Sequence, residues 1–286
     1  MRKSEPAAGN AVAVKPVPIL LYHSVSDDVS APFRPWTVPP RLFEEHMGYL
    51  VSHGFTPMTV SAFVDRVMHR GEHVEKPVVV TFDDGFADTH THALPVLSRF
   101  GIPATLYVVT GAIGRTSRWL RDQGEGDRPI LDWAQLRELA SEGVECGAHG
   151  LAHRMLDTMP FSAACAQIVR SKQVLEDGLA MEVRSFAYPH GYYTRRLQEC
   201  VRETGYSSAA GVKHAMSAGN DDVYALARII IRPDTGVSSF GRLLSGDGLR
   251  VAPKRAVLQT AGWRMLRKAK EMMSDGPQDR GNAWSL

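Results

Sequence analysis

The segment Val78-Val79-Val80-Thr81-Phe82-Asp83-Asp84-Gly85 runs from an apolar, strand-like stretch into two adjacent carboxylates. β-Branched and aromatic residues without polar alternation are typical of a strand buried on both faces, as in a parallel sheet. Carboxylates at the end of such a strand are costly to bury unless a partner or a metal ion holds them. Successive side chains of a strand face opposite ways, so only a turn, which Gly85 permits, would bring Asp83 and Asp84 into one site. A solvated Asp-Asp-Gly turn is the plainer alternative.

Strand-like and helix-like segments alternate around this stretch. Further strands are expected at 19–22, 104–109, 144–147, 183–188, 206–210 and 226–231, and helices at about 43–53, 88–100, 132–142, 161–177 and 194–204. Such alternation predicts parallel βαβ units and an α/β fold, and at least seven strands fit a barrel better than an open sheet. Pro95 argues against one unbroken helix at 88–100. The Gly- and Arg-rich segment 111–130 is expected to be a long loop, either a lid, a groove wall or simple filler.

The composition is that of a globular chain. Its 286 residues are 44% hydrophobic, which is enough for a sizeable core in one large or two small domains. The formal net charge of +2 favours neither nucleic acid nor an acidic surface as the partner. Cys146, Cys165 and Cys200 cannot form a closed set of disulfides, and their spacings match no CxxC zinc site.

The chain divides into three parts. Residues 1–16 are expected to form a disordered arm, 17–246 a single barrel domain, and 247–286 a charged, partly helical tail. The start contains no apolar run typical of a secretory leader, and no stretch is long enough to span a bilayer. A cytoplasmic location is therefore expected, unless a mis-assigned start site has removed a leader.

Two histidines follow the strand expected at 144–147. His149 and His153 share one face if the segment is helical, and this spacing suits two ligands of one divalent ion. It is the spacing of HExxH metalloproteases, but the missing Glu removes the base of that mechanism. A carboxylate from another strand end would complete a two-His, one-carboxylate set. Two surface histidines beside a strand are the alternative.

Two more motifs stand at strand ends. In Phe186-Ala187-Tyr188-Pro189-His190-Gly191 a strand runs into a turn whose backbone N–H could donate to an oxyanion, and Gly191 would let a substrate approach the backbone. An ordinary turn is the alternative. Leu21-Tyr22-His23-Ser24-Val25 places a lone histidine after the first strand, where a histidine is usually structural. Active sites of barrels gather at the carboxyl ends of their strands, which links all these motifs.

In this order, the stretch Thr81 to Gly85, the pair His149 and His153, and the stretch Phe186 to Gly191 resemble the motifs of the NodB-homology polysaccharide deacetylases, carbohydrate esterase family four. The resemblance covers about residues 18–235. It implies a distorted (β/α)7 TIM-like barrel that removes N-acetyl groups from amino sugars with a divalent metal ion, commonly Zn2+, with Co2+, Ni2+ or Fe2+ as alternatives. It implies the general base Asp83 and the metal ligands Asp84, His149 and His153.

The stretch Leu21 to Val25 resembles the branch that includes poly-N-acetylglucosamine deacetylases, and this implies that His23 is the general acid. In the implied hydrolysis Asp83 takes a proton from water, the backbone N–H of His190 helps to hold the oxyanion, and His23 protonates the leaving amine. The residues expected at the oxyanion or the substrate are Tyr188, Pro189, His190, Gly191, Arg228, Trp36 and Trp119. For the two tryptophans, core packing and a sugar platform are equally open.

Three features depart from the family pattern. Gly150 replaces a usual Ser or Thr, Ala187 stands where many members have an Arg that orients the base, and no His follows Leu226 in a Leu-x-His motif. Arg184 or Arg228 are the candidates to replace the missing Arg.

The partner expected from these motifs is an N-acetylated glycan, and the even charge balance fits a neutral sugar better than a polyanion. Two other functions stay open at this point. One is an O-acetyl esterase or another amide hydrolase on the same barrel. The other is a non-catalytic carbohydrate-binding protein, although such a module has no need for all four of Asp83, Asp84, His149 and His153.

Overall fold

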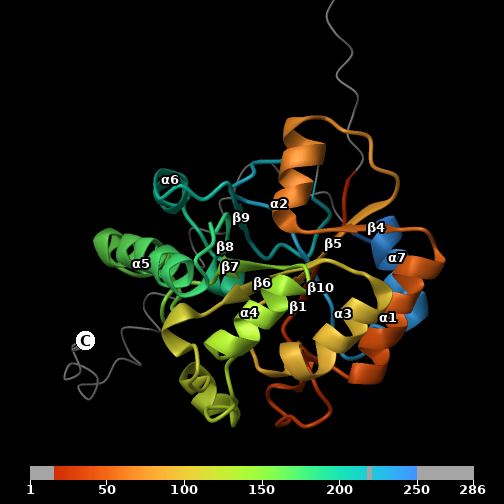
Figure 1. Ribbon diagram of the computed structural model, residues 1–286, viewed down its shortest axis with the longest axis horizontal. Coiled ribbons are helices and arrows are strands. Elements are labelled where there is room, and N and C mark those ends of the chain that lie inside the picture. The colour runs from red at the N-terminus through yellow and green to blue at the C-terminus, as the bar shows by residue number, and fades with distance from the viewer. Residues whose placement is uncertain (1–15, 218–220, 250–286) are drawn as a thin grey trace, which may run out of the picture.

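A curled, parallel sheet forms the centre of the computed structural model, which describes residues 16–217 and 221–249 (Figure 1). Its strands are Ile19–Tyr22 (β1), Thr56–Met58 (β4), Pro77–Phe82 (β5), Ala104–Val108 (β6), Val144–Ala148 (β7), Ser185–Ala187 (β8), Ser208–Ala210 (β9) and Ile229–Ile230 (β10). Their order is β10-β1-β5-β6-β7-β8-β9, with β4 paired to β5 beside this path. A separate ladder joins Ser24–Val25 (β2) to Thr37–Val38 (β3).

Helices surround this sheet (Figure 1). The α-helices are Pro40–Ser52 (α1), Val60–Phe63 (α2), Leu94–Phe100 (α3), Trp133–Ser141 (α4), Phe161–Leu179 (α5), Arg195–Glu203 (α6) and Val237–Ser245 (α7). Shorter 3-10 or π-helical segments are Arg34–Trp36 (η1), Val64–His69 (η2), Thr89–Ala93 (η3), Thr110–Ala112 (η4), Arg118–Gln123 (η5) and Pro189–Gly191 (η6). The apolar faces of α1, α4, α5 and α6 pack towards the strands and form one continuous core with them.

The two ends of the sheet approach one another through the chain between β9 and β10. Leu226 forms a parallel bridge with Ala210, the last residue of β9, shortly before the chain enters β10. β10 pairs with β1 on its other side, where Leu20 lies opposite Ile229. The sheet is therefore a distorted barrel of seven parallel strands, which confirms the predicted fold class.

The strand β5 is central, as its sequence predicts. Five of its six residues are buried, and Phe82 pairs with Tyr22 of β1 and with Leu106 of β6. Because the strands are parallel, their carboxyl ends meet at one edge of the barrel. The residues that follow β1, β5, β7 and β8 are therefore brought together there.

The structure decides several local expectations. The segment 88–100 is not one unbroken helix, as expected, because a π-helical segment, Thr89–Ala93, precedes α3 and Pro95 occupies the first turn of α3. The loop 111–130 is not simple filler, since it contains η5 and bridges Thr116 to Pro129. It packs around a small apolar cluster of its own: Phe33, Phe86, Val109, Ala112, Leu120 and Ile130. The expected arm 1–16, apart from Pro16, and nearly all of the expected tail 247–286 lie outside the described residues.

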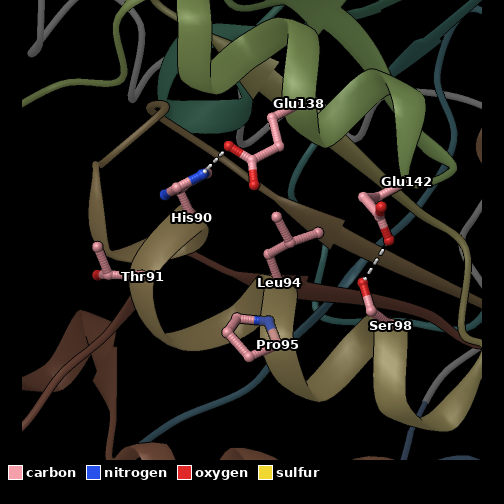
Figure 2. A pocket seen from close by; sticks show the side chains of 7 residues that line it. All are labelled: His90, Thr91, Leu94, Pro95, Ser98, Glu138 and Glu142. Atoms are coloured by element: carbon pink, nitrogen blue, oxygen red, sulfur yellow. Dashed lines mark hydrogen bonds and ion pairs between the residues drawn. The ribbon is translucent and has the colours of Figure 1, made fainter.

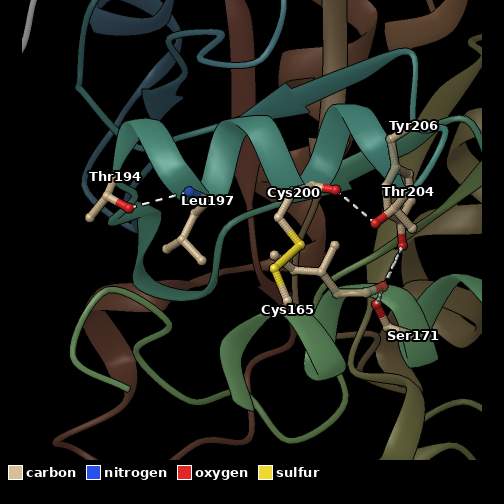
Figure 3. The surroundings of a disulfide bond; sticks show 8 residues. Cys165, Ser171, Thr194, Leu197, Cys200, Thr204 and Tyr206 are labelled. Atoms are coloured by element: carbon tan, nitrogen blue, oxygen red, sulfur yellow. Dashed lines mark hydrogen bonds between the residues drawn. A yellow bond between two sulfur atoms is a disulfide. The ribbon is translucent and has the colours of Figure 1, made fainter. Parts of the chain in front are cut away.

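Cys165 of α5 and Cys200 of α6 form a disulfide, with their Cα atoms 6.1 Å apart (Figure 3). Cys146, in β7, is a buried free thiol. One of the three cysteines therefore remains unpaired, as an odd number requires, and the other two form the disulfide. No helix in the described part of the chain combines the length and the apolar character needed to cross a bilayer.

Candidate active site and metal centre

The turn after β5 brings the two adjacent aspartates to one side. Asp84 has a φ of 73° and Gly85 a φ of 81°, and the Gly85 N–H donates to the Asp83 carbonyl at 2.9 Å. A Cβ atom on Gly85 would lie 2.9 Å from a methyl carbon of Val108, so the turn also packs closely against β6. The predicted turn is present, but it begins at Asp84, one of the few residue types besides glycine that adopt a left-handed backbone with any frequency.

Asp83 is held by a fully buried arginine. The Arg228 guanidinium donates to both carboxylate oxygens of Asp83, at 2.6 and 2.7 Å, and also to the Gly211 carbonyl at 3.0 Å. Burial raises the pKa of Asp83, but the charges of Arg228 and His149 outweigh it and bring the pKa below its usual value. Asp83 is thus an ionised, oriented carboxylate. Arg184, the other candidate, pairs instead with Asp65.

His149 is fixed in one tautomer. Its Nδ1–H donates to the Ala187 carbonyl at the end of β8, at 2.8 Å, which leaves Nε2 as the atom with the lone pair. Nε2 lies 3.5 Å from Asp84 Oδ1 and 3.8 Å from Asp83 Oδ2. Burial lowers the pKa of His149 to about 4, so the ring is neutral and able to act as a ligand.

His153 reaches the same carboxylate by a different route from the one predicted. The segment from 149 to 153 is not helical, and His153 has a φ of 50°. Its Nε2 lies 3.1 Å from Asp84 Oδ1, and its ring centre lies 5.1 Å from that of His149. The two histidines lie close together, as predicted. The prediction that a helix would bring them together was wrong, because a compact loop does so.

Asp84, His149 and His153 meet the requirements of a divalent metal site. One ligand atom from each lies within 4.8 Å of the others. Asp84 Oδ1 is buried and accepts no well-formed hydrogen bond among the described residues. Burial raises the pKa of Asp84, but the nearby histidines more than offset this and lower it. An ionised carboxylate and two imidazole nitrogens are ligands that zinc and similar divalent ions take in proteins. No hydrogen-bond donor among the described residues satisfies Asp84 Oδ1, so this atom is available to a metal ion.

His23 lies directly after β1, close enough to the aspartates to be affected by their charges. Its Nδ1 is buried and has no hydrogen-bond partner among the described residues. Burial lowers the pKa of His23, while Asp84 and Asp83 act to raise it. The ring centre is 5.3 Å from that of Trp36. This histidine is therefore at the site and not merely in the core.

Comparison with known proteins agrees with this geometry. The family described as polysaccharide deacetylase matches residues 70–209. The YxkH protein of Bacillus subtilis (strain 168) is 27% identical over 225 residues, 79% of this chain and 75% of its own length. Over residues 70–209 the chain is similar to the polysaccharide deacetylase family. A poly-beta-1,6-N-acetyl-D-glucosamine N-deacetylase of Staphylococcus epidermidis is 23% identical over 209 residues, 70% of this chain and 69% of that protein.

Solved structures support the fold of this chain. The Streptococcus pyogenes deacetylase PplD, in complex with acetate, aligns with a TM-score of 0.68 and 21% identity, covering 82% of this chain and 98% of PplD. IcaB from Ammonifex degensii aligns with a TM-score of 0.66 and 23% identity, covering 81% of this chain and 97% of IcaB. At these identities the likeness establishes the barrel alone.

The third motif of the chain, Phe186 to Gly191, is mostly structural. The Tyr188 side chain is fully buried and its hydroxyl donates to the Tyr224 carbonyl, so the expectation that it contacts substrate is not met. A Cβ atom on Gly191 would lie 2.5 Å from the backbone nitrogen of Val212. Gly191 therefore makes room for the neighbouring chain and not, as expected, for a substrate. Pro189 is also buried.

His190 remains the exposed member of this motif. Its ring centre lies 4.5 Å from that of His153, and its backbone has a φ of 58°. The His190 backbone N–H has no acceptor within the described part of the chain. It is therefore available to a ligand, in keeping with the role expected for it.

The deacetylase site also contains a buried ionic network that the motifs did not reveal. Asp88 accepts hydrogen bonds from the Ser24 hydroxyl at 2.9 Å, the Val25 N–H at 3.0 Å and Arg128 at 2.7 Å. Arg128 also pairs with Glu125, at 3.1 Å. The network thus ties the residues just after His23 to the loop 111–130. Nothing in local spacing points to it, because its members are far apart in sequence.

The two tryptophans flank the metal-ligand cluster. Trp119, on η5, lies 5.2 Å from the His153 ring, and its buried Nε1–H has no partner among the described residues. Trp36 lies against His23 and below Arg232. Both are half-buried, so each keeps an accessible edge at the site.

A separate hollow of about 410 Å³ lies between η3, α3 and α4 (Figure 2). Two contacts cross it, His90 to Glu138 at 2.8 Å and Ser98 to Glu142 at 2.9 Å. None of the sequence-predicted site residues lines it. It therefore adds nothing to the chemistry of the deacetylase site.

Proposed function

We propose that this chain is a metal-dependent hydrolase that removes N-acetyl groups from the amino sugars of a glycan. The observation that carries the proposal is the ionised Asp83, locked by Arg228, beside the buried Asp84, His149 and His153 cluster. The match of residues 70–209 to the polysaccharide deacetylase family supports the reaction class. The relatives that act on poly-beta-1,6-N-acetyl-D-glucosamine support a polymer of N-acetylglucosamine as the substrate class.

Asp84, His149 and His153 would hold the metal ion, with zinc favoured and cobalt, nickel or iron as alternatives. When bound, such an ion would polarise the acetyl carbonyl and make water easier to deprotonate. The hydrogen bond to the Ala187 carbonyl fixes the tautomer of His149, so Nε2 is the atom that would bind the metal ion.

Asp83 accepts the proton of the attacking water. Two charge-assisted hydrogen bonds from Arg228 fix the plane of its carboxylate, and each oxygen keeps a second lone pair for the water. An oriented base of this kind reduces the reorganisation needed in the transition state. The His190 N–H donates to the oxyanion that develops on the acetyl carbonyl.

His23 donates a proton to the leaving amine. An amine is a poor leaving group without that proton, so a general acid on the far side of the scissile bond is required. His23 is placed for this role because its Nδ1 is buried and unpaired within the described residues. Burial lowers the pKa of His23, and the charges of Asp84 and Asp83 oppose that shift without cancelling it.

The test is release of acetate from N-acetylglucosamine oligomers, with metal content measured on the same samples. Asp83→Asn should abolish turnover and keep the metal, whereas His149→Ala should lose the metal. His23→Ala should slow turnover by about 10²–10⁴-fold, as expected for loss of a general acid. Asp132→Asn, which changes an acidic cap of α4 away from the site, is the matched control.

Near-normal turnover by Asp83→Asn would refute the assignment of the base. A loss below about threefold for His23→Ala would return that residue to a structural role. Acetate release from O-acetylated sugars, with none from N-acetylated ones, would instead identify an O-acetyl esterase. Binding of glycan by a metal-free preparation without any turnover would favour a carbohydrate-binding protein.

A cytoplasmic location stays a prediction, and one observation argues against it. The Cys165–Cys200 disulfide is of a kind that persists in oxidising compartments and is rare in the reducing cytoplasm. Thiol labelling of the chain in its native cells, followed by mass spectrometry, distinguishes a cytoplasmic protein from an exported one. Labelled Cys165 and Cys200 indicate the cytoplasm, and cysteines protected from labelling indicate an exported protein.

A further inference from the structure

An exposed arginine stands at the rim of the site, one aromatic ring away from His23. The Arg232 guanidinium carbon lies 5.6 Å from the centre of the Trp36 ring, and that ring lies 5.3 Å from the ring of His23. Arg232 follows β10 closely, so it belongs to the same edge of the barrel as the other site residues. Its charge is therefore held over Trp36, beside the group proposed to protonate the leaving amine.

The backbone of Arg232 is firmly anchored. Its N–H donates to the Thr235 hydroxyl and its carbonyl accepts from the Thr235 N–H, both at 3.0 Å. The Thr235 carbonyl in turn accepts a hydrogen bond of 2.7 Å from the buried His46 of α1. The preceding Ile231 N–H donates to the Leu21 carbonyl in β1. A side chain on such a turn starts from a fixed position, which reduces the entropy lost when it binds a ligand.

The charge of Arg232 is not neutralised by the described protein. Arg128 and Arg228 are buried and paired with carboxylates, whereas Arg232 is exposed and forms no ion pair within residues 16–217 and 221–249. Asp234 lies in the same turn but does not pair with it. A guanidinium stacked on an indole keeps its planar fork of N–H donors, which matches the two oxygens of a carboxylate or phosphate.

A second exposed arginine is next to the other tryptophan in sequence. Arg118 immediately precedes Trp119, whose ring lies 5.2 Å from that of the ligand His153. Arg118 forms no ion pair among the described residues either. Although the net charge of the chain is only +2, Arg232 therefore places an unpaired positive charge beside Trp36.

We propose that Arg232, supported on Trp36, binds an anionic substituent, a carboxylate or a phosphate, on the sugar next to the one that is deacetylated. The proposal rests on the proposed function and narrows its substrate class, since it replaces the neutral glycan expected from the even charge balance with one that has acidic groups. The ion pair forms at an exposed site, so it contributes selectivity between substrates more than overall affinity.

The test compares three short glycans of identical length: a neutral N-acetylglucosamine oligomer, one with a carboxylate on the neighbouring sugar, and one with a phosphate there. The measured quantity is the ratio of kcat/KM for each acidic glycan to that for the neutral glycan. We expect wild type to favour at least one acidic glycan, and R232Q to lower that ratio about fivefold. R232K should be intermediate, because it keeps the charge without the fork. R242Q, on α7, is the matched control.

Two further measurements are the salt dependence of the substrate preference and the direct binding of the glycans. Added salt should reduce the preference of wild type for the acidic glycan and leave R232Q unaffected. A wild type without any preference, or a ratio unchanged in R232Q, overturns the inference while leaving the proposed deacetylation intact. If the metal-loaded wild type releases acetate from none of the glycans, the proposed function fails instead. In that case calorimetric binding of the same glycans to wild type and R232Q still decides the role of Arg232.

Discussion

Replacing Arg228 with Gln tests whether the buried ion pair with Asp83 organises the site. Arg228 is fully buried and donates two charge-assisted hydrogen bonds to Asp83, at 2.6 and 2.7 Å. Removing it leaves an ionised carboxylate in the core without its main partner. This is more serious than loss of an exposed ion pair, because water cannot replace the guanidinium.

Two independent estimates agree on the magnitude. Breaking a buried ion pair from one side costs about 3–5 kcal/mol. Losing two hydrogen bonds to a charged group, at about 1.5–3 kcal/mol each, gives about 3–6 kcal/mol. Since a domain is stabilised by only about 5–15 kcal/mol, Arg228→Gln should be marginally folded. Arg228→Lys, which keeps the charge and one hydrogen bond, should lose about 1.5–3 kcal/mol.

The assay is urea unfolding at pH 7 of the metal-free protein, run as a double-mutant cycle with Asp83→Asn. The double variant Asp83→Asn/Arg228→Gln has no buried charge at this pair, so it should be more stable than Arg228→Gln alone. Deacetylation by Arg228→Lys should fall about tenfold or more, because the base is no longer held by two bonds. A loss below about 1 kcal/mol in Arg228→Gln, with no coupling to Asp83→Asn, would refute the reasoning.

Three further predictions concern separate parts of the fold. Burial lowers the pKa of His46 from 6.5 to about 4, so its contribution to stability is complete above pH 6.5 and lost as the pH falls towards 4. Thermal unfolding should show a loss of about 3 kcal/mol over this range in wild type and a smaller one in His46→Gln. Cys165→Ser should lower the free energy of unfolding by about 3–4 kcal/mol for this separation of 35 residues, as should reduction of the Cys200 disulfide in wild type. Asp88→Asn should slow deacetylation about ten- to hundredfold without loss of metal, because the chain after His23 loses its anchor; unchanged turnover would contradict this.

The barrel was predictable because strand-like and helix-like segments alternate repeatedly along the chain. The run Val78 to Phe82 has the composition of a strand buried on both faces, and β5 is such a strand. β4 was missed because it is short and contains Pro57, a residue that usually argues against a strand. Pro57 is tolerated because β4 pairs only with β5.

The site was predictable in its members but less so in its geometry. His153 comes four positions after His149 on a helix or in a compact loop alike, so the spacing indicates proximity without specifying the backbone. The partner of Asp83 is 145 residues away in sequence, and no local pattern could decide between Arg184 and Arg228. Only the strand order, which sets β10 next to β1 and one strand away from β5, brings the Arg228 side chain to Asp83 and makes that choice.

The first and third motifs share a backbone feature, which is a pair of consecutive residues with positive φ. Asp84 and Gly85 are both left-handed, with φ of 73° and 81°, and so are His190 and Gly191, with φ of 58° and 76°. In each pair a functional residue takes a conformation that costs about 1–2 kcal/mol outside glycine, and the glycine after it continues the turn. The close contacts of Gly85 with Val108 and of Gly191 with Val212 leave no room for a side chain. Gly85 and Gly191 therefore allow the tight turns that follow β5 and β8, and these turns set the positions of Asp84 and His190.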